Sequence, residues 1–149
     1  MGRVAVEKTL HGDAGLGFSA VCQRSAVVNE AGQLLFLYGT LKRGERNHRL
    51  LASESFVCEA VTEPRYRLYD CGAHPALVED ETNGRAIRGE VYLVGPTTLR
   101  RLDVLEDAPD LYELRPVRLQ DFTPPVWTYL YRQDVRGLPE CGEAWSGRN

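Results

Sequence analysis

The longest uninterrupted apolar run in this sequence is only five residues long, at positions 34–38. A helix that crosses a bilayer needs about 20 apolar residues, so this run is too short for a membrane span. Its length suits a single buried β-strand. Further short apolar stretches follow along the chain. The sequence therefore predicts a fold of many short strands, and we expect no membrane partner.

Strand-like and helix-like patterns together indicate the fold class. Two segments have helical character: residues 96–106, where Pro96 follows Gly95, and residues 48–52, where Asn47 is placed to act as the N-cap. Many short strands with two short helices indicate the α+β class. We expect a single small domain with a mixed β-sheet that closes into a barrel-like core. Strands are predicted at residues 34–38, 56–61, 65–70, 75–78, 86–94, 112–120 and 126–132.

The chain of 149 residues has the usual length of one domain. Residues 1–32 contain several glycines and a broken apolar pattern, so they are interpreted as a loosely held N-terminal extension. Regular patterning covers residues 33–133, which we take as the domain. Residues 134–149 are interpreted as a C-terminal tail.

Charge and cysteine content exclude some classes of function. A net charge of −3 argues against a nucleic-acid-binding protein, for which a clustered basic face is expected. The four cysteines are scattered without a CxxC pair, which is typical of reduced thiols in a cytoplasmic protein. The sequence shows no cluster of metal-ligand residues.

The first candidate site is the glycine-containing turn at residues 38–44, which starts with Tyr38, Gly39, Thr40 and Leu41. Glycine permits a sharp bend and a close approach to the main chain. Successive amides in such a turn form an anion-binding concavity in some proteins. The other interpretation is an ordinary strand-to-helix turn, and the local pattern alone favours it. The P-loop spacing is absent.

The second candidate is Glu106, at the end of the predicted helix 96–106. Leu99, Leu102 and Leu105 share one face, and Glu106 falls inside this apolar stripe, with Asp103 at its edge. A buried carboxylate has a raised pKa, which suits a general acid/base working near neutral pH. The alternative is a glutamate that reaches solvent past the last leucine, and periodicity alone slightly favours that alternative.

Three other residues are weaker candidates. Cys71 and His74 lie three positions apart in a loop, but nothing in the sequence supplies a third catalytic group, so an unreactive cysteine is the favoured interpretation. Glu90 lies on the same side of its predicted strand as Tyr92. It is either a second buried carboxylate or a surface residue.

Four motifs in the same order resemble the γ-glutamylcyclotransferase-like family. The turn at residues 38–41 resembles its Y-G-[ST]-L opening, and residues 102–106 with Tyr112 resemble its L-D-x-x-E helix and following strand. Residues 68–78 and 88–92 resemble its two intervening strand motifs. The resemblance covers about two-thirds of the chain and is strongest to a short bacterial branch that includes γ-glutamylamine cyclotransferase. Other branches often carry glycine after the glutamate, where this chain has Asp107.

The resemblance implies a reaction in which a γ-glutamyl amide cyclises to 5-oxoproline and releases a free amine, without a cofactor. It makes Glu106 the catalytic acid/base and gives the glycine turn the role of a backbone amide donor site. The leaving amine stays open: a peptide, a lysine-derived amine or a group on a natural product. The implied substrate-binding residues are Tyr38, Gly39, Thr40, Leu41 and Tyr112.

Two alternatives stay open beside this interpretation. One is a binding module that keeps the pocket without turnover, and the other is a related enzyme acting on a different aminoacyl conjugate. In each case the expected partner is a small-molecule γ-glutamyl or similar conjugate. We expect a monomer, because no predicted helix has an evident apolar face left for a second copy.

Overall fold

The computed structural model describes residues 32–146, so the predicted N-terminal extension lies outside the described residues apart from Gly32. All seven predicted strands are confirmed, with ends that differ by a few residues. The helix predicted at residues 96–106 is confirmed as well. The elements in chain order are β1 (Gln33–Leu37), the 3-10 helix η3 (His48–Leu51), β2 (Ser55–Val61), β3 (Tyr66–Asp70), β4 (Pro75–Glu79), β5 (Arg88–Val94), α2 (Pro96–Leu105), β6 (Tyr112–Val117) and β7 (Val126–Tyr131).

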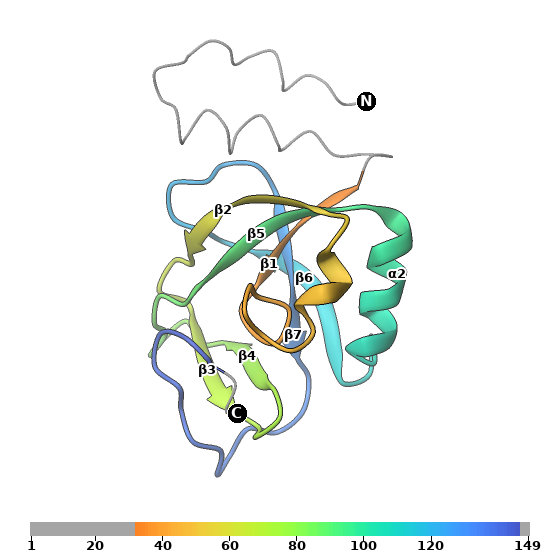
Figure 1. Cartoon of the computed structure of the whole chain (residues 1–149). Coiled ribbons are helices and arrows are strands. Elements are labelled where there is room, and N and C mark those ends of the chain that lie inside the picture. Colours follow the sequence, from red (N-terminus) through yellow and green to blue (C-terminus); the bar gives the residue numbers. More distant parts are fainter. Residues whose placement is uncertain (1–31, 147–149) are drawn as a thin grey trace.

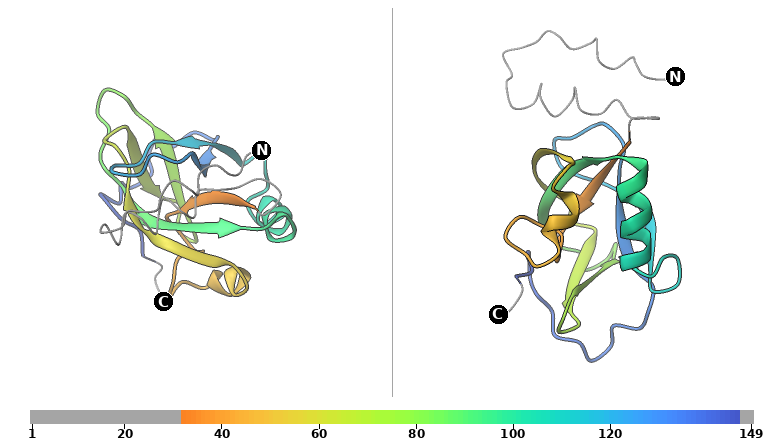
Figure 2. Two further views of the ribbon diagram at one scale, coloured as in Figure 1. Left: turned by 90° about the horizontal axis from the view of Figure 1, so that it is seen from above. Right: turned by 45° about the vertical axis from the view of Figure 1, so that its right-hand side comes forward.

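Five of the strands form one sheet in the order β2-β5-β1-β7-β6, so the first strand lies at its centre (Figure 1). β1 pairs antiparallel with β5 and parallel with β7. β3 and β4 form a separate antiparallel pair that lies below the sheet in Figure 1. α2 and η3 lie near each other, as the second view in Figure 2 shows. The mixed α+β class predicted from the sequence is therefore confirmed.

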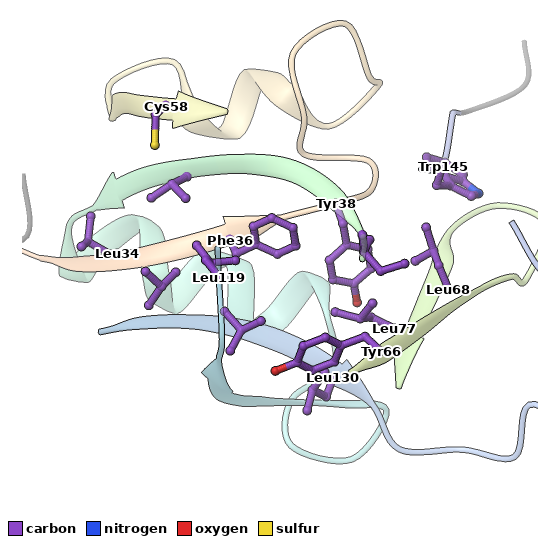
Figure 3. Close-up of a cluster of buried hydrophobic side chains, with 14 of the residues drawn as sticks. Leu34, Phe36, Tyr38, Cys58, Tyr66, Leu68, Leu77, Leu119, Leu130 and Trp145 are labelled. Atoms are coloured by element: carbon purple, nitrogen blue, oxygen red, sulfur yellow. The ribbon is translucent and has the colours of Figure 1, made fainter. Parts of the chain in front are cut away.

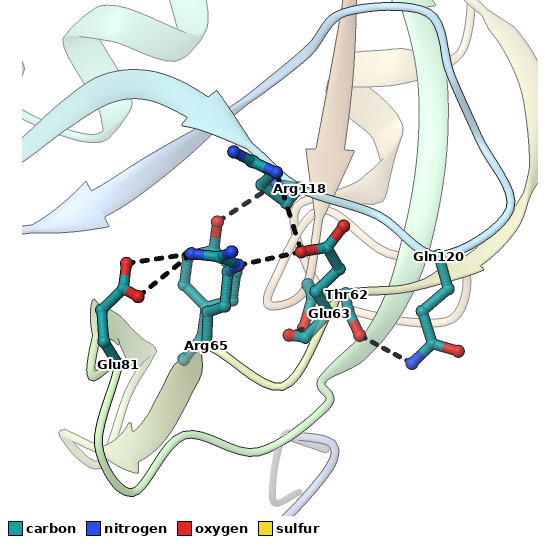
Figure 4. Close-up of polar contacts among 7 residues, drawn as sticks. Thr62, Glu63, Arg65, Glu81, Arg118 and Gln120 are labelled. Atoms are coloured by element: carbon teal, nitrogen blue, oxygen red, sulfur yellow. Dashed lines mark hydrogen bonds and ion pairs between the residues drawn. The ribbon is translucent and has the colours of Figure 1, made fainter.

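The predicted closure into a barrel is wrong, because no ladder joins the two edge strands, β2 and β6. The chain beyond these strands meets in one isolated bridge between Thr62 and Leu119. Two main-chain bonds flank the bridge, from Glu63 N to Arg118 O at 2.9 Å and from Gln120 N to Val61 O at 2.8 Å. Side chains supplement this narrow contact (Figure 4): Glu63 pairs with Arg65 at 2.8 Å and Arg118 at 4.0 Å.

The second predicted helix is a single 3-10 turn rather than an α-helix. Asn47 occupies its N-cap position, but the Asn47 side chain makes no capping hydrogen bond. Its Nδ2 donates instead to Thr40 Oγ1 at 2.9 Å. The asparagine therefore holds the preceding turn, not the helix.

β1 is apolar on both faces because a core cluster covers each of them. Leu34 and Phe36 point into one cluster, which Figure 3 shows together with Tyr38, Leu68 and Leu77. Leu35 and Leu37 point into the second cluster, which lies against α2 through Leu102. Alternate residues of a strand face opposite sides, so a strand between two layers needs apolar residues at every position.

Residues 134–146, interpreted from the sequence as a tail, pack along β3. Tyr69 forms an isolated bridge with Glu140, and Cys141 N donates to Leu68 O at 2.8 Å. The Glu140 carboxylate accepts from Arg67 at 2.5 Å and from Arg85 at 2.8 Å. Trp145 is buried in the first core cluster (Figure 3). Up to Ser146, this segment is thus built into the domain.

Replacing Trp145 with alanine tests this packing. Trp145 is 4% exposed, and truncating a buried tryptophan typically costs about 3–5 kcal/mol. We expect the free energy of unfolding of Trp145→Ala, measured in urea, to fall by this amount. Glu143→Gln is the matched control in the same segment, because its exposed ion pair with Arg88 contributes less than about 1 kcal/mol. Equal small losses in both variants would contradict a structural role for the segment.

Candidate active site

A pocket opens where β1 ends and the turn at residues 38–44 begins. Its floor and walls come from four places that are distant in sequence. They are the end of β1 with the following turn, the start of β4, the end of α2, and the paired strands β6 and β7. The lining residues are Phe36, Leu37, Tyr38, Gly39, Thr40, Leu41, His74, Pro75, Glu106, Tyr112 and Tyr129.

Three residues of the turn line the pocket and have main-chain amides without an acceptor in the described part of the chain. None of the hydrogen bonds among the described residues uses the amide N–H of Gly39, Thr40 or Leu41. The turn itself is fixed by other bonds, from Lys42 N to Gly39 O at 3.1 Å and from Asn47 N to Thr40 O at 2.9 Å. Unpaired amides are rare in the interior of proteins, so these three N–H groups are available to an acceptor from outside the protein.

Glycine is required at position 39 because the Pro75 ring lies against it. A Cβ atom added there would lie 2.7 and 2.8 Å from two carbon atoms of that ring. The tight contact brings the turn against the start of β4 and closes one side of the pocket. Gly39 therefore serves packing as well as main-chain geometry.

A buried carboxylate holds the turn from behind. Glu90 on β5 accepts from the Arg43 amide at 3.0 Å and from Arg43 Nε at 3.2 Å. Arg43 also reaches the exposed Glu59 at 3.0 Å and lies over the Phe56 ring. Of the two interpretations that the sequence left open, the structure supports the buried one. Glu90 does not line the pocket, so its contribution is to the position of the turn.

Glu106 follows the last residue of α2 and lines the pocket at that end. Burial raises the pKa of its carboxyl group from 4.5 to about 7. The helix stripe is only partly as predicted: Leu102 is fully buried, but Leu105 is exposed because the helix ends there. Desolvation of Glu106 therefore comes from the pocket walls more than from its own helix. A carboxyl group of this kind both accepts and donates protons near neutral pH.

Three tyrosines line the pocket, and each hydroxyl proton is already committed to an acceptor. Tyr38 donates to Tyr129 O at 2.5 Å, and Tyr129 donates to Asp103 at 2.6 Å. Tyr112 donates to Pro75 O. Burial raises the pKa of all three hydroxyl groups, so they stay protonated. Asp103, at the edge of the predicted helix stripe, is thus tied to the pocket wall.

The structure brings the predicted site residues into this one pocket: Tyr38, Gly39, Thr40, Leu41, Glu106 and Tyr112 all line it. Sequence reasoning gave no pocket role to Pro75 or His74, and it left Tyr129 open between pocket wall and core. Alternation along residues 126–132 placed Tyr129 on one face of a strand, but no signal showed which face meets the pocket. The Cys71 thiol lies outside the lining, and its pKa is raised by burial, which disfavours a nucleophilic thiolate.

Within residues 32–146, no three histidine, cysteine, aspartate or glutamate side chains gather closely enough to hold a metal ion. In the same part of the chain, no helix combines the length and apolar character needed to cross a membrane.

Similarity to known proteins agrees with this geometry. Residues 35–147 match the family described as "Gamma-glutamyl cyclotransferase, AIG2-like". The chain belongs to the γ-glutamylcyclotransferase family. The match includes the turn at residues 38–41, Glu106 and the C-terminal segment. Membership supports an enzyme of this type, and the recognition made from the four sequence motifs is confirmed.

Individual relatives extend this finding. A putative gamma-glutamylcyclotransferase of Vibrio cholerae is 42% identical over 103 residues, covering 69% of this chain and 85% of that protein. The human gamma-glutamylaminecyclotransferase is 42% identical over 94 residues, covering 58% of this chain and 61% of that protein. The crystal structure of a mouse AIG2-like protein superimposes with a TM-score of 0.64 at 26% identity, covering 76% of this chain and 88% of that one.

The raised pKa of Glu106 predicts a pH dependence of stability. The folded state binds the proton of the Glu106 carboxyl group more tightly than the unfolded state does. The contribution of this protonated group to stability is therefore full below about pH 4.5 and is lost as the pH rises through about 7. Glu106→Gln carries no such charge. We expect the difference in free energy of unfolding between the variant and the native protein to be about 2 kcal/mol larger, in favour of the variant, at about pH 8.5 than at about pH 5.

Urea unfolding at the two pH values measures this difference. Asp110→Asn is the matched control, because Asp110 is an exposed acid four residues further along the chain. Its stability is expected to follow that of the native protein at both pH values. A Glu106→Gln curve that also runs parallel to the native one would contradict a desolvated carboxyl group.

Proposed function

We propose that this chain converts a γ-glutamyl amide into 5-oxoproline and a free amine, with Glu106 as the general acid/base. The observation that carries the proposal is the pairing of two features in one pocket. One is a carboxyl group whose pKa is raised to about 7, and the other is a run of three main-chain amides without a protein acceptor. The first suits proton transfer, and the second suits binding of anionic oxygens.

In the proposed reaction, the substrate's own α-amine is the nucleophile. The Glu106 carboxylate takes a proton from the α-ammonium, and the freed amine attacks the γ-carbonyl carbon to form the new ring bond. Glu106 gives this proton to the leaving nitrogen and takes a second proton from the attacking nitrogen, which keeps one hydrogen in the ring. The bond from the γ-carbon to the leaving nitrogen then breaks, and Glu106 passes the second proton to the freed amine, which departs as an ammonium ion. Each turnover leaves Glu106 ionised again and consumes no water. A group with a pKa near the working pH is suited to these transfers.

The turn would act through its backbone. An intramolecular attack requires the glutamyl chain to be folded so that the amine faces the carbonyl carbon, which lowers the barrier by several kcal/mol. The amides of Gly39, Thr40 and Leu41 are available for the α-carboxylate and for the oxyanion that develops on the γ-carbonyl. Tyr38 and Tyr112 would form walls, since their hydroxyl protons are committed elsewhere.

γ-Glutamyl amines are the substrate class that we propose. Support comes from the human relative named gamma-glutamylaminecyclotransferase, of which the alignment covers 61%. The proposed route uses only groups of the protein and the substrate, and the cofactor independence expected from the sequence is part of the proposal.

Glu106→Gln tests the acid/base role. Glutamine keeps the shape of the side chain but cannot transfer a proton, and a general acid/base typically contributes about 10²–10⁴-fold to the rate. We expect the release of 5-oxoproline, scored by mass spectrometry over a panel of γ-glutamyl conjugates, to fall at least about a hundredfold. Binding of the conjugate, measured by calorimetry, should survive.

Asp110→Asn is again the suitable control and should keep near-native turnover. Asp103 is less suitable, because its carboxylate accepts from Tyr129 in the pocket wall. Retention of more than about a tenth of the activity by Glu106→Gln would exclude Glu106 as the acid/base. If the native protein binds a conjugate tightly but does not turn it over, the interpretation as an enzyme is replaced by that of a binding module without catalytic activity.

Gly39→Ala tests the role of the turn. The added methyl group must displace the Pro75 ring or the turn itself, so we expect substrate affinity to fall at least about tenfold. Thr40→Ser is the matched control, because serine keeps the hydroxyl group that accepts from Asn47. Similar losses in the two variants would assign the effect to the Thr40 side chain rather than to the main chain.

A further inference from the structure

His74 lines the same pocket as Glu106 but has no part in the mechanism given above. It lies immediately before β4, half-buried, with its ring packed against two aromatic neighbours. The ring centroids are 5.8 Å apart for His74 and Tyr112, and 6.5 Å apart for His74 and Tyr131. These contacts hold the imidazole in one orientation at the pocket wall.

The hydrogen bonds around Tyr112 determine which nitrogen of His74 carries a proton. The Tyr112 hydroxyl group has a single proton, and it is donated to Pro75 O. His74 Nδ1 lies 2.7 Å from the same hydroxyl oxygen. Because that oxygen has no second proton to give, Nδ1 must be the donor in this contact. In the neutral ring, Nε2 is then a bare acceptor, and no hydrogen bond among the described residues uses it.

The pocket has many donors and few strong acceptors for a substrate. Its free main-chain amides are donors, and its three tyrosine hydroxyl protons are already used within the protein. Among the lining side chains, the strong acceptors left are the Glu106 carboxylate and His74 Nε2. A γ-glutamyl amide brings several N–H groups, on its α-ammonium and on its amide nitrogen. One carboxylate cannot accept from both nitrogens at all stages of the reaction.

We propose that His74 is a substrate-binding residue whose Nε2 accepts a hydrogen bond from a nitrogen of the γ-glutamyl substrate. This inference rests on the proposed function and adds a residue that determines which conjugates bind well. Tyr112 and Pro75 serve it by fixing the proton on Nδ1, so that Nε2 is presented as an acceptor. Conjugates that offer an N–H at this point are favoured over those that do not.

Two amide variants separate substrate binding from structural support. Asparagine places its NH₂ near the position of Nδ1, so His74→Asn keeps the donor to Tyr112 but removes the acceptor. Glutamine places its amide oxygen near the position of Nε2, so His74→Gln keeps the acceptor but removes the donor. We expect His74→Asn to raise KM for γ-glutamyl methylamide at least about tenfold, as expected for the loss of one hydrogen bond to the substrate. His74→Gln should stay within about threefold of the native protein.

The reverse order, with His74→Gln impaired and His74→Asn near native, would overturn the proposal and make His74 a support for Tyr112 alone. Equal KM values in all three proteins would overturn it as well. Melting temperatures of both variants are measured alongside, and KM is compared only between folded proteins. If either variant does not fold, Tyr112→Phe combined with the surviving variant supplies the comparison.

A second substrate identifies the nitrogen that His74 contacts. The γ-methyl ester of glutamate keeps the α-ammonium but has no amide N–H. A KM defect of His74→Asn that is confined to the methylamide points to the leaving nitrogen, whereas the same defect with the ester points to the α-ammonium. A defect with neither compound overturns the proposal.

The test also separates this inference from the proposed function. If the native protein releases no 5-oxoproline, the proposed function fails, and the same three proteins are compared by calorimetry for binding of γ-glutamyl methylamide. Weaker binding in His74→Asn alone supports the role of His74 even then. No binding by the native protein overturns both.

Discussion

The central position of β1 is the constraint on which the rest of the domain depends. Its residues are buried on both faces, between a cluster around Phe36 and a cluster around Leu35. Each fully buried side chain of this size contributes about 1.5–3 kcal/mol, so the strand is a major source of stability. β5 pairs along one edge of the strand and β7 along the other, which fixes where the chain leaves the sheet. The turn at residues 38–41 therefore starts from a rigid point.

In the pocket, burial by apolar and aromatic side chains changes the pKa of a carboxyl group instead of adding to stability. Apolar and aromatic walls that would stabilise a neutral side chain raise the pKa of Glu106 by withholding water. Three tyrosines contribute area without offering their protons, because each is bonded to Tyr129 O, Pro75 O or Asp103. The site thus keeps a carboxyl group in an environment that disfavours its charge. Such local costs are common at functional sites, where the surrounding core offsets them.

Much of the fold was accessible from the sequence because short strands leave a local signature. The run of residues 34–38 and the alternation after Tyr112 and Val126 identified strands whose ends differ from the structure by a few residues. Pairing between distant strands leaves no such signature, which is why barrel closure was predicted and one bridge between Thr62 and Leu119 was found. The packing of residues 134–146 on β3 depends on the same kind of distant contact.

In the candidate site, too, local features could be predicted from the sequence, whereas contacts between distant segments could not. Motif resemblance located the glycine turn and Glu106, and apolar periodicity suggested that Glu106 is buried. The cause of its burial was only partly accessible, since Leu105 is exposed and the pocket walls come from other elements. His74 was weighed only as a partner of Cys71, because both lie in one loop. Its actual partner, Tyr112, comes from a strand nearly forty residues further along.

The parallel pairing of β1 with β7 has a consequence for how the domain reaches its folded state. Leu35 pairs with Trp127, and the Tyr38 hydroxyl bonds to the main chain of Tyr129, across a separation of 91 residues. A large loop must be closed before such contacts contribute, so folds rich in them form slowly for their size. During synthesis, β1 emerges first and has to wait for β7. Until then the edge of β1 that pairs with β7 is free, and the pocket lacks the wall that β7 supplies.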